Sequence, residues 1–224
     1  MRPYVLVNVA ISADGKLSTR ERRQVKISGP DDFDRVDSIK AGADAIMVGI
    51  GTVLADDPSL TVKSPNRIAD RLSLGRPEHP VRVIVDSRGR TPTDAKILHK
   101  GPGRRIIAVS HAAPAENITR LKEHADIITI GQEEVNLTEL LEELGKEGIG
   151  KLMVEGGGTL ISGLFRSGLV DQFCMFIGNM IIGGSQAPTP ADGSGWTHEA
   201  DFAKLELMQV QQLDEGVLIT WKVK

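Results

Sequence analysis

Short apolar runs alternate with segments of helical spacing along most of this 224-residue chain. The first run, Tyr4 to Ile11, is apolar except for Asn8 and predicts a buried strand. Similar runs predict strands at 45–48, 81–86, 105–109, 126–130, 151–154 and 171–178. Apolar positions spaced three and four apart predict helices at 30–40, 114–124, 137–147 and 159–167. This regular alternation predicts an α/β fold with a largely parallel sheet and helices on both of its faces.

The C-terminal region departs from that alternation. Runs at 204–212 and 217–222 flank the turn Asp214-Glu215-Gly216, which predicts an antiparallel hairpin at the edge of the sheet. The charged segment from Pro65 to Pro80 is bounded by prolines and is interpreted as a surface excursion. The length fits one domain, so we expect a single domain over residues 1–224.

Charge and hydropathy narrow the class of partner. The 27 basic and 30 acidic residues give a net charge of −3, which weighs against general affinity for nucleic acid or anionic membranes. The chain has no signal-peptide pattern and no apolar run of about 18 residues, so we expect a cytoplasmic protein.

Basic residues nevertheless gather in two places. One group contains Arg20, Arg22, Arg23 and Lys26, and a more dispersed group contains Arg67, Arg71 and Arg76. They lie either in solvated loops or where they attract a phosphorylated small molecule.

Thiol and metal chemistry are not expected. The single cysteine, Cys174, excludes an intramolecular disulfide, and its apolar surroundings predict a thiol in the core. The five histidines show no metal-ligand spacing, and we expect no metal site. The motifs of serine hydrolases and zinc deaminases do not occur.

A first glycine-bearing segment follows the predicted strand 45–48. It reads Gly49-Ile50-Gly51-Thr52 and continues to Asp56-Asp57-Pro58. Thr52 and Asp56 are four residues apart, so a helical turn would place both on one face. A hydroxyl and a carboxylate there suit ribose hydroxyls or a polar heterocycle. The alternative is that Asp57-Pro58 only ends a helix.

A second segment, Glu155-Gly156-Gly157-Gly158-Thr159, follows the predicted strand 151–154. Glycines allow backbone N–H groups to approach a phosphate at the start of a helix, and the Thr159 hydroxyl adds a donor. The segment is neither the dinucleotide fingerprint nor a Walker A loop. The alternatives are a tight turn and a carboxylate placed near solvent. If both segments converge at the carboxyl edge of the sheet, they form a nucleotide pocket.

With these residues identified, the chain resembles the riboflavin-pathway reductases with the dihydrofolate-reductase-like fold over essentially its whole length. The matching segments are 8–16, 49–62, 80–87, 154–158 and Gly183-Gly184 with the loop 187–190. The resemblance implies a mostly parallel central sheet flanked by helices, with a C-terminal antiparallel hairpin. It also implies a homodimer.

The resemblance further implies an NADPH-dependent oxidoreductase. Its substrate would be 2,5-diamino-6-ribosylamino-4(3H)-pyrimidinone 5′-phosphate, whose ribosyl side chain is reduced at C1′ to the ribitylamino product. The family's cofactor-binding positions correspond to Thr52, Asp56, Ser87, Gly156, Gly157, Gly158 and Thr159, with Ile130-Gly131 also close to the cofactor. Its substrate-binding positions correspond to Asn8, Asp14, Ser28, Asp57, Leu60, Lys63 and Glu155.

Two roles follow from side-chain chemistry and this resemblance together. Glu155 or Asp56 could handle the proton that accompanies the hydride, and water is a third candidate. Lys63 and the basic cluster Arg20–Lys26 are the candidates for binding the substrate phosphate.

At two positions this chain differs from the bacterial members of the family, and both differences concern which substrate it reduces. Bacterial members fused to a deaminase carry Lys at the position of Asn8 and Arg at that of Lys63, so this chain looks like the stand-alone archaeal and fungal type, which reduces before deamination. The alternatives are reduction of the deaminated 5-amino-6-ribosylamino-uracil 5′-phosphate, a pteridine or dihydrofolate reductase, and a nucleotide-binding regulatory module without catalysis. The residues alone do not distinguish NADPH from NADH.

Overall fold

The structure of the protein is a computed structural model that describes residues 1–23 and 25–224. The chain forms two compact units. Unit 1 contains Met1–Tyr4 and Asp37–Met153, and unit 2 contains Val5–Val36 and Val154–Lys224. That residues 1–224 act as one domain stays a prediction.

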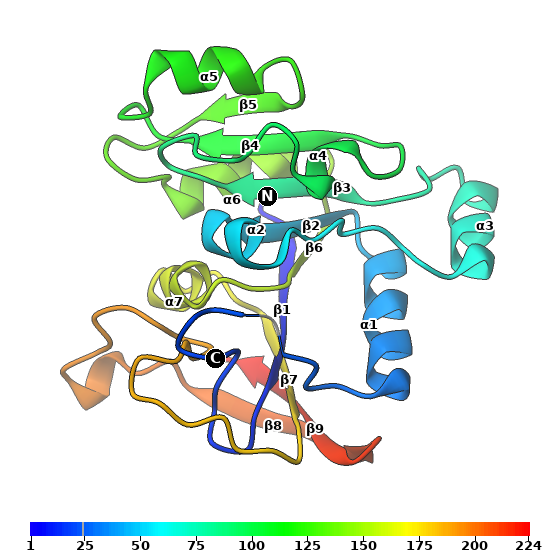
Figure 1. Ribbon diagram of the computed structural model, residues 1–224, viewed down its shortest axis with the longest axis vertical. Helices are drawn as coiled ribbons and strands as arrows, with labels where there is room; N and C mark the ends of the chain where they lie inside the picture. The colour runs from blue at the N-terminus through cyan, green and yellow to red at the C-terminus, as the bar shows by residue number, and fades with distance from the viewer. Residues whose placement is uncertain (24) are drawn as a thin grey trace. The chain divides into compact units, whose positions relative to one another are not determined.

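Unit 1 is built on strands in the order β5-β4-β3-β2-β6, four of which follow one another in Figure 1 from β5 to β2. Their bounds are β2 Ala45–Gly49, β3 Val81–Val85, β4 Arg105–Val109, β5 Asp126–Thr129 and β6 Lys151–Val154. The pairs β2–β3, β3–β4 and β4–β5 are parallel, with Met47 opposite Val83 and Val83 opposite Ile106. All three side chains are fully buried, as the continuous apolar runs predicted.

Helices accompany these strands. They are α2 Ile50–Asp56, α4 Lys96–His99, α5 Ala115–Leu121 and α6 Leu137–Lys146, together with the C-terminal part of α1, which spans Pro30–Gly42. Among them, α1, α5 and α6 lie where the 3.6-residue spacing predicted helices. The α6 helix begins at Asn136, whose side chain accepts hydrogen bonds from the backbone of Thr138 and Glu139. It buries Leu140, Leu141 and Leu144 completely. The four-residue α4 was not predicted.

The segment interpreted as a surface excursion contains a further helix, α3, at Pro65–Ser73. Ser64 caps its N-terminus by accepting from Arg67 N, and Pro65 occupies the first turn, where a missing N–H is tolerated. Arg71 is only 4 % exposed and donates from Nη1 to the carbonyls of Ala41 and Ala43, at the end of α1. The excursion is therefore anchored by a buried guanidinium.

Unit 2 contains strands in the order β1-β7-β9-β8. Their bounds are β1 Tyr4–Ile11, whose first residue belongs to unit 1, β7 Gln172–Ile177, β8 Leu205–Leu213 and β9 Gly216–Val223. β1 and β7 are parallel, whereas β9 is antiparallel to both β7 and β8. The predicted C-terminal antiparallel hairpin is confirmed.

Unit 2 also contains α7 Gly158–Arg166, the first part of α1 and the short 3-10 helix η1 Glu199–Asp201. Phe165 on α7 packs edge-on against Phe173 on β7, with ring centroids 5.4 Å apart. Cys174 on β7 is 4 % exposed, and burial raises the pKa of its thiol. The prediction of a core thiol is confirmed.

No helix within residues 1–23 and 25–224 is long and apolar enough to cross a membrane.

Candidate functional site

The first glycine-bearing segment lies where β2 ends and α2 begins in unit 1. Thr52 and Asp56 both lie on α2, one helical turn apart, as their spacing predicted. Both side chains are half-buried, and burial raises the pKa of the Asp56 carboxyl. An added Cβ at Gly51 would meet no atom within 4 Å, so packing does not require this glycine. Gly51 is exposed and leaves its backbone open to a close approach.

Two residues after α2 have a left-handed backbone although neither is glycine. Asp57 has φ 42° and Leu60 has φ 49°, a conformation that disfavours side chains by about 1–2 kcal/mol each. Leu60 is nevertheless 3 % exposed. Such strain is concentrated at functional sites, which makes this turn a candidate.

The Asp57 carboxylate already has partners within unit 1. Its Oδ1 accepts from the backbone N of Lys96 at 2.7 Å, and Lys96 Nζ lies 3.1 Å from Oδ2. The backbone N–H of Lys96 is the main cause that lowers the pKa of Asp57. A substrate contact from Asp57 therefore has to share a carboxylate that also anchors the start of α4.

Lys63 follows this turn and is held by groups on both sides. Its Nζ donates to Ser59 Oγ at 2.8 Å and to Thr61 Oγ1 at 2.6 Å. Its backbone N donates to Asp37, a buried residue of α1 that also accepts from Ser64 N. Asp37 was not predicted as a site residue, because its spacing on α1 does not reveal which loop it contacts.

Ser87 and Gly131, two residues predicted to lie close to the cofactor, follow the ends of β3 and β5. Ser87 Oγ accepts from Val135 N at 3.1 Å, and the Ser87 carbonyl accepts from the hydroxyl of Ser110 at 2.8 Å. Gly131 has φ 79°, and a Cβ there would lie 2.1 Å from the carbonyl oxygen of Glu134. Only glycine fits such a position. Ser87 and Gly131 thus lie at the carboxyl ends of strands in one parallel sheet, where ligands of α/β proteins bind.

The second glycine-bearing segment belongs to unit 2 and begins α7. Gly156 and Gly157 have φ of 145° and 91°, so both require glycine for backbone reasons. A Cβ at Gly158 would lie 2.4 Å from the carbonyl oxygen of Thr189, which explains the third glycine by packing. Glu155, immediately before them, is half-buried. The backbone of this segment therefore forms the tight turn that was one of the alternatives for it. A tight turn of glycines can also bind a ligand through its backbone N–H groups.

Asn8 on β1 is 7 % exposed and its side-chain oxygen is fixed by Arg35 of α1. Arg35 Nη2 donates to Asn8 Oδ1 at 2.7 Å, while Arg35 Nε donates to Asp32 Oδ1 at 2.8 Å. Because a guanidinium can only donate, Asn8 has to turn its oxygen toward Arg35 and its NH₂ group away. Arg35 and Asp32 were not predicted from the sequence.

Asp14 lies in the loop after β1 and is exposed, and both oxygens of its carboxylate accept hydrogen bonds. It accepts from Ser12 Oγ at 2.6 Å and from the backbone N of Ile182 and Gly183 at 3.0 and 2.7 Å. These bonds, the one from Ser12 first, lower the pKa of Asp14 from its ordinary value of 3.8 to about 2. Asp14 thus joins two loops of unit 2.

The remaining candidates differ in exposure. Ser28 is 7 % exposed. The basic cluster, with Gln24 of that stretch lying outside the described residues, is exposed at Arg20, Arg22, Arg23 and Lys26. The dispersed cations make specific contacts in unit 1 instead of lying in solvated loops: Arg67 pairs with Asp37, Arg71 binds carbonyls and Arg76 pairs with Asp44.

Each unit therefore gathers part of the predicted set. Unit 1 contains Thr52, Asp56, Asp57, Leu60, Lys63 and Ser87, and unit 2 contains Asn8, Asp14, Ser28, Glu155, Gly156, Gly157, Gly158 and Thr159. The convergence of the two glycine-bearing segments stays a prediction, because they belong to different units. Within the described part of the chain, no group of three His, Cys, Asp or Glu side chains could hold a metal ion.

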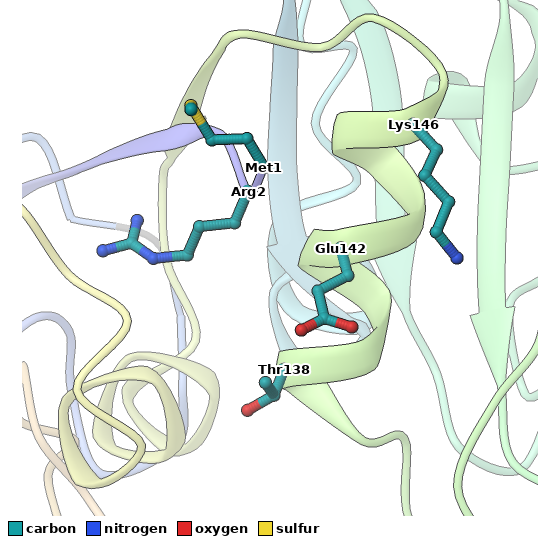
Figure 2. A pocket seen from close by; sticks show the side chains of 5 residues that line it. All are labelled: Met1, Arg2, Thr138, Glu142 and Lys146. Carbon is teal, nitrogen blue, oxygen red and sulfur yellow. The ribbon is translucent and has the colours of Figure 1, made fainter.

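A hollow of about 310 Å³ lies elsewhere, beside α6 in unit 1 (Figure 2). Thr138, Glu142 and Lys146 project from one side of α6, and Met1 and Arg2 complete the lining. None of the predicted site residues lines this hollow.

Comparison with known sequences places these observations in a family. Residues 3–219 match the profile of the RibD C-terminal domain. A protein of Archaeoglobus fulgidus named 2,5-diamino-6-ribosylamino-4(3H)-pyrimidinone 5′-phosphate reductase is 46 % identical over 98 % of both chains. A protein of the same name from Methanothermobacter thermautotrophicus is 42 % identical over the full length of both.

Solved structures agree on the fold. RibD of Acinetobacter baumannii superposes with a TM-score of 0.80 at 27 % identity, covering 100 % of this chain and 58 % of that one. The riboflavin biosynthesis reductase Rib7 of Saccharomyces cerevisiae gives 0.75 at 23 % identity, covering 100 % and 90 %. Dihydrofolate reductase of Enterococcus faecalis gives 0.50 at 11 % identity, covering 98 % and 96 %. The dihydrofolate-reductase-like fold is confirmed, and the chain belongs to the RibD C-terminal domain family.

Proposed function

We propose that this protein is an NADPH-dependent reductase that converts the ribosyl side chain of 2,5-diamino-6-ribosylamino-4(3H)-pyrimidinone 5′-phosphate to the ribitylamino product. The observation that carries the proposal is the identity of 42–46 % over essentially the whole chain with two reductases named for that substrate. Fold likeness alone would not support it, since the dihydrofolate reductase fold is shared at 11 % identity.

Features of each unit fit a nucleotide cofactor. Gly51 has open space at its backbone, and Gly156 and Gly157 have backbone angles that exclude side chains, so neither segment blocks a close approach of phosphate. When bound, NADPH would supply the hydride. Thr52, Asp56 and Ser87 of unit 1 and Gly156, Gly157, Gly158 and Thr159 of unit 2 would hold it.

The remaining residues divide between substrate binding and proton transfer. Lys63, with its ammonium steered by Ser59 and Thr61, would bind the substrate phosphate together with the exposed basic cluster. Asp56 and Glu155 are the candidates for the proton. The raised pKa of Asp56 supports it, because a carboxyl that keeps its proton to higher pH is a better general acid.

Asn8 bears on the choice of pyrimidine. With its oxygen held by Arg35, it would present N–H donors to the substrate, whereas a Lys at this position would present a positive charge. The choice of the ring that has not been deaminated rests on Asn8, since bacterial members fused to a deaminase carry Lys at this position. Asp14, Ser28, Asp57 and Leu60 would complete the substrate side.

The test is a matched set of assays with purified protein. NADPH oxidation is followed with the diamino substrate, with its deaminated uracil counterpart and with dihydrofolate, and each is repeated with NADH. We expect the highest kcat/KM for NADPH with the diamino substrate. Faster turnover of the uracil compound would contradict the proposed choice of substrate. Turnover of dihydrofolate would contradict the proposed reaction. NADPH binding without turnover of any substrate would indicate a regulatory module.

A further inference from the structure

The first turn of α1 is capped by a residue of the C-terminal hairpin. The N–H groups at the start of a helix have no partner within the helix and need an acceptor from elsewhere. Here the carboxylate of Asp214 supplies it twice. Its Oδ1 accepts from Asp31 N at 3.1 Å, and its Oδ2 accepts from Asp32 N at 2.9 Å. One carboxylate from a remote turn therefore satisfies two N–H groups at the start of α1.

Gly29 occupies the position from which a local side chain would ordinarily cap this helix. Its carbonyl accepts from Phe33 N at 3.1 Å, as that of a capping residue does, but it has no side chain to offer. A Cβ at Gly29 would lie only 2.6 and 2.7 Å from the two carboxylate oxygens of Asp214. Asp214 thus fills the space of the missing local cap, and a side chain at position 29 would displace it.

The turn that carries Asp214 is itself fixed to the sheet of unit 2. Asp214 lies between β8 and β9 with φ 48° and is half-buried. A Cβ at Gly216 would collide with the carbonyl oxygen of Ile177, so the turn packs closely on the end of β7. The next residue after Asp214, Glu215, accepts from Asn179 Nδ2 at 2.8 Å. The turn can therefore hold the start of α1 in a defined place.

Two residues proposed to bind the substrate depend on the capped turn. Ser28 is 7 % exposed and lies directly before it. Within the turn, the buried side chain of Asp32 accepts from Arg35 Nε at 2.8 Å. Arg35 also donates to Asn8 Oδ1 at 2.7 Å. A displacement of this turn would move Ser28 directly and Asn8 through Arg35.

We propose that Asp214 is a positioning residue for the substrate side of the reductase, and that it sets the places of Ser28 and Asn8 through the start of α1. A cap at position 29 would stabilise the helix without attaching it to another element. Asp214 lies 182 residues from Asp32 in the sequence, so its bonds attach the helix to the hairpin. The inference rests on the proposed function, in which Ser28 and Asn8 contact the pyrimidine.

The first test compares two carboxylates of the same turn. Asp214→Ala should raise the KM for the diamino pyrimidine about tenfold, while the Kd for NADPH stays within about twofold. A role in stability alone would reduce the number of folded molecules, which lowers the apparent kcat and leaves KM unchanged. The matched control is Glu215→Ala, whose carboxylate is bonded to Asn179, and its KM should stay within about twofold of wild type. An unchanged KM in Asp214→Ala, or an equal rise in Glu215→Ala, overturns the proposal.

A double variant separates capping from attachment to the hairpin. Gly29→Ser combined with Asp214→Ala supplies a local cap in the space that the carboxylate leaves. In urea unfolding it should recover at least about half of the stability that Asp214→Ala loses. Its KM should nevertheless stay raised, because the start of α1 is no longer attached to the turn. Recovery of the wild-type KM together with the stability would show that any cap suffices and would overturn the proposal.

A further measurement needs no substrate and is made by NMR on the full-length protein. In Asp214→Ala, the amide of Asp32 should exchange with solvent at least about tenfold faster than in wild type, and the side-chain amide signal of Asn8 should shift. Glu215→Ala should change neither. An unaltered Asn8 signal in Asp214→Ala overturns the proposal even in an active enzyme. A protein that shows both changes but reduces no pyrimidine refutes the proposed function and leaves the positioning of Asn8 by Asp214 established.

Discussion

Replacement of Arg35 by Met tests how unit 2 holds Asn8 in position. Arg35 donates to Asp32 and to Asn8 at 2.8 and 2.7 Å, and these two residues are only 1 % and 7 % exposed. Methionine preserves most of the aliphatic stem but removes every donor. The change therefore isolates the two hydrogen bonds from the packing of the side chain.

The expected loss of stability follows from the burial of Asp32. Removing one partner of a buried ion pair costs about 3–5 kcal/mol, because the other charge is left without compensation. The Arg35 side chain is itself 19 % exposed, so water can reach part of the space it leaves, and we expect about 3 kcal/mol. The double variant Arg35→Met/Asp32→Asn also removes the buried charge and should recover at least about half of that loss.

Urea unfolding followed by circular dichroism measures both variants against wild type. Under the proposed function, the KM for the pyrimidine should rise about tenfold in the single and the double variant alike, because neither fixes the Asn8 amide by a charge-assisted bond. A free energy of unfolding of Arg35→Met within about 0.5 kcal/mol of wild type would refute the reasoning, since that is the range of ordinary surface substitutions. So would a double variant that is less stable than the single one.

Three further predictions concern other residues. Glu155→Gln should lower kcat by roughly a hundredfold while the Kd for NADPH stays within about twofold, and unchanged turnover would remove its role in proton transfer. The lowered pKa of Asp14 stabilises the fold above pH 3.8, and this contribution is lost as the pH falls to about 2. The stability difference between wild type and Asp14→Asn should therefore shrink over that interval in acid titrations, and a constant difference would contradict the assignment. Arg71→Leu leaves three backbone carbonyls without their donor and should cost about 3 kcal/mol or more by thermal unfolding, whereas a neutral effect would show that α3 is not anchored there.

Elements with strong periodicity were predictable from sequence. β1 has the predicted bounds, Tyr4–Ile11, and the hairpin turns at the predicted residues. The α3 helix was not predicted, because its main anchor is the buried Arg71. A charged residue in a polar segment is normally expected to be exposed to solvent. Its capping residue, Ser64 before a proline, was the signal that could have revealed it.

The candidate site was predictable only where spacing along one element decides the geometry. Thr52 and Asp56 share a helix because they are four residues apart. The partners of Asp14 and Asp57 could not be read in this way, because Gly183 and Lys96 are remote in sequence. Buried carboxylates such as Asp37 were missed for the same reason: periodicity locates a residue on its helix but does not identify what it contacts.

The proposed reaction is tested most directly by following the transferred hydrogen. NADPH that carries deuterium at both C4 positions is incubated with the enzyme and the diamino substrate, and the pyrimidine product is analysed by mass spectrometry and NMR. The expected product is the ribitylamino compound with a single deuterium at C1′. Consumption of NADPH with an unlabelled product, or with deuterium on the pyrimidine ring, would contradict it.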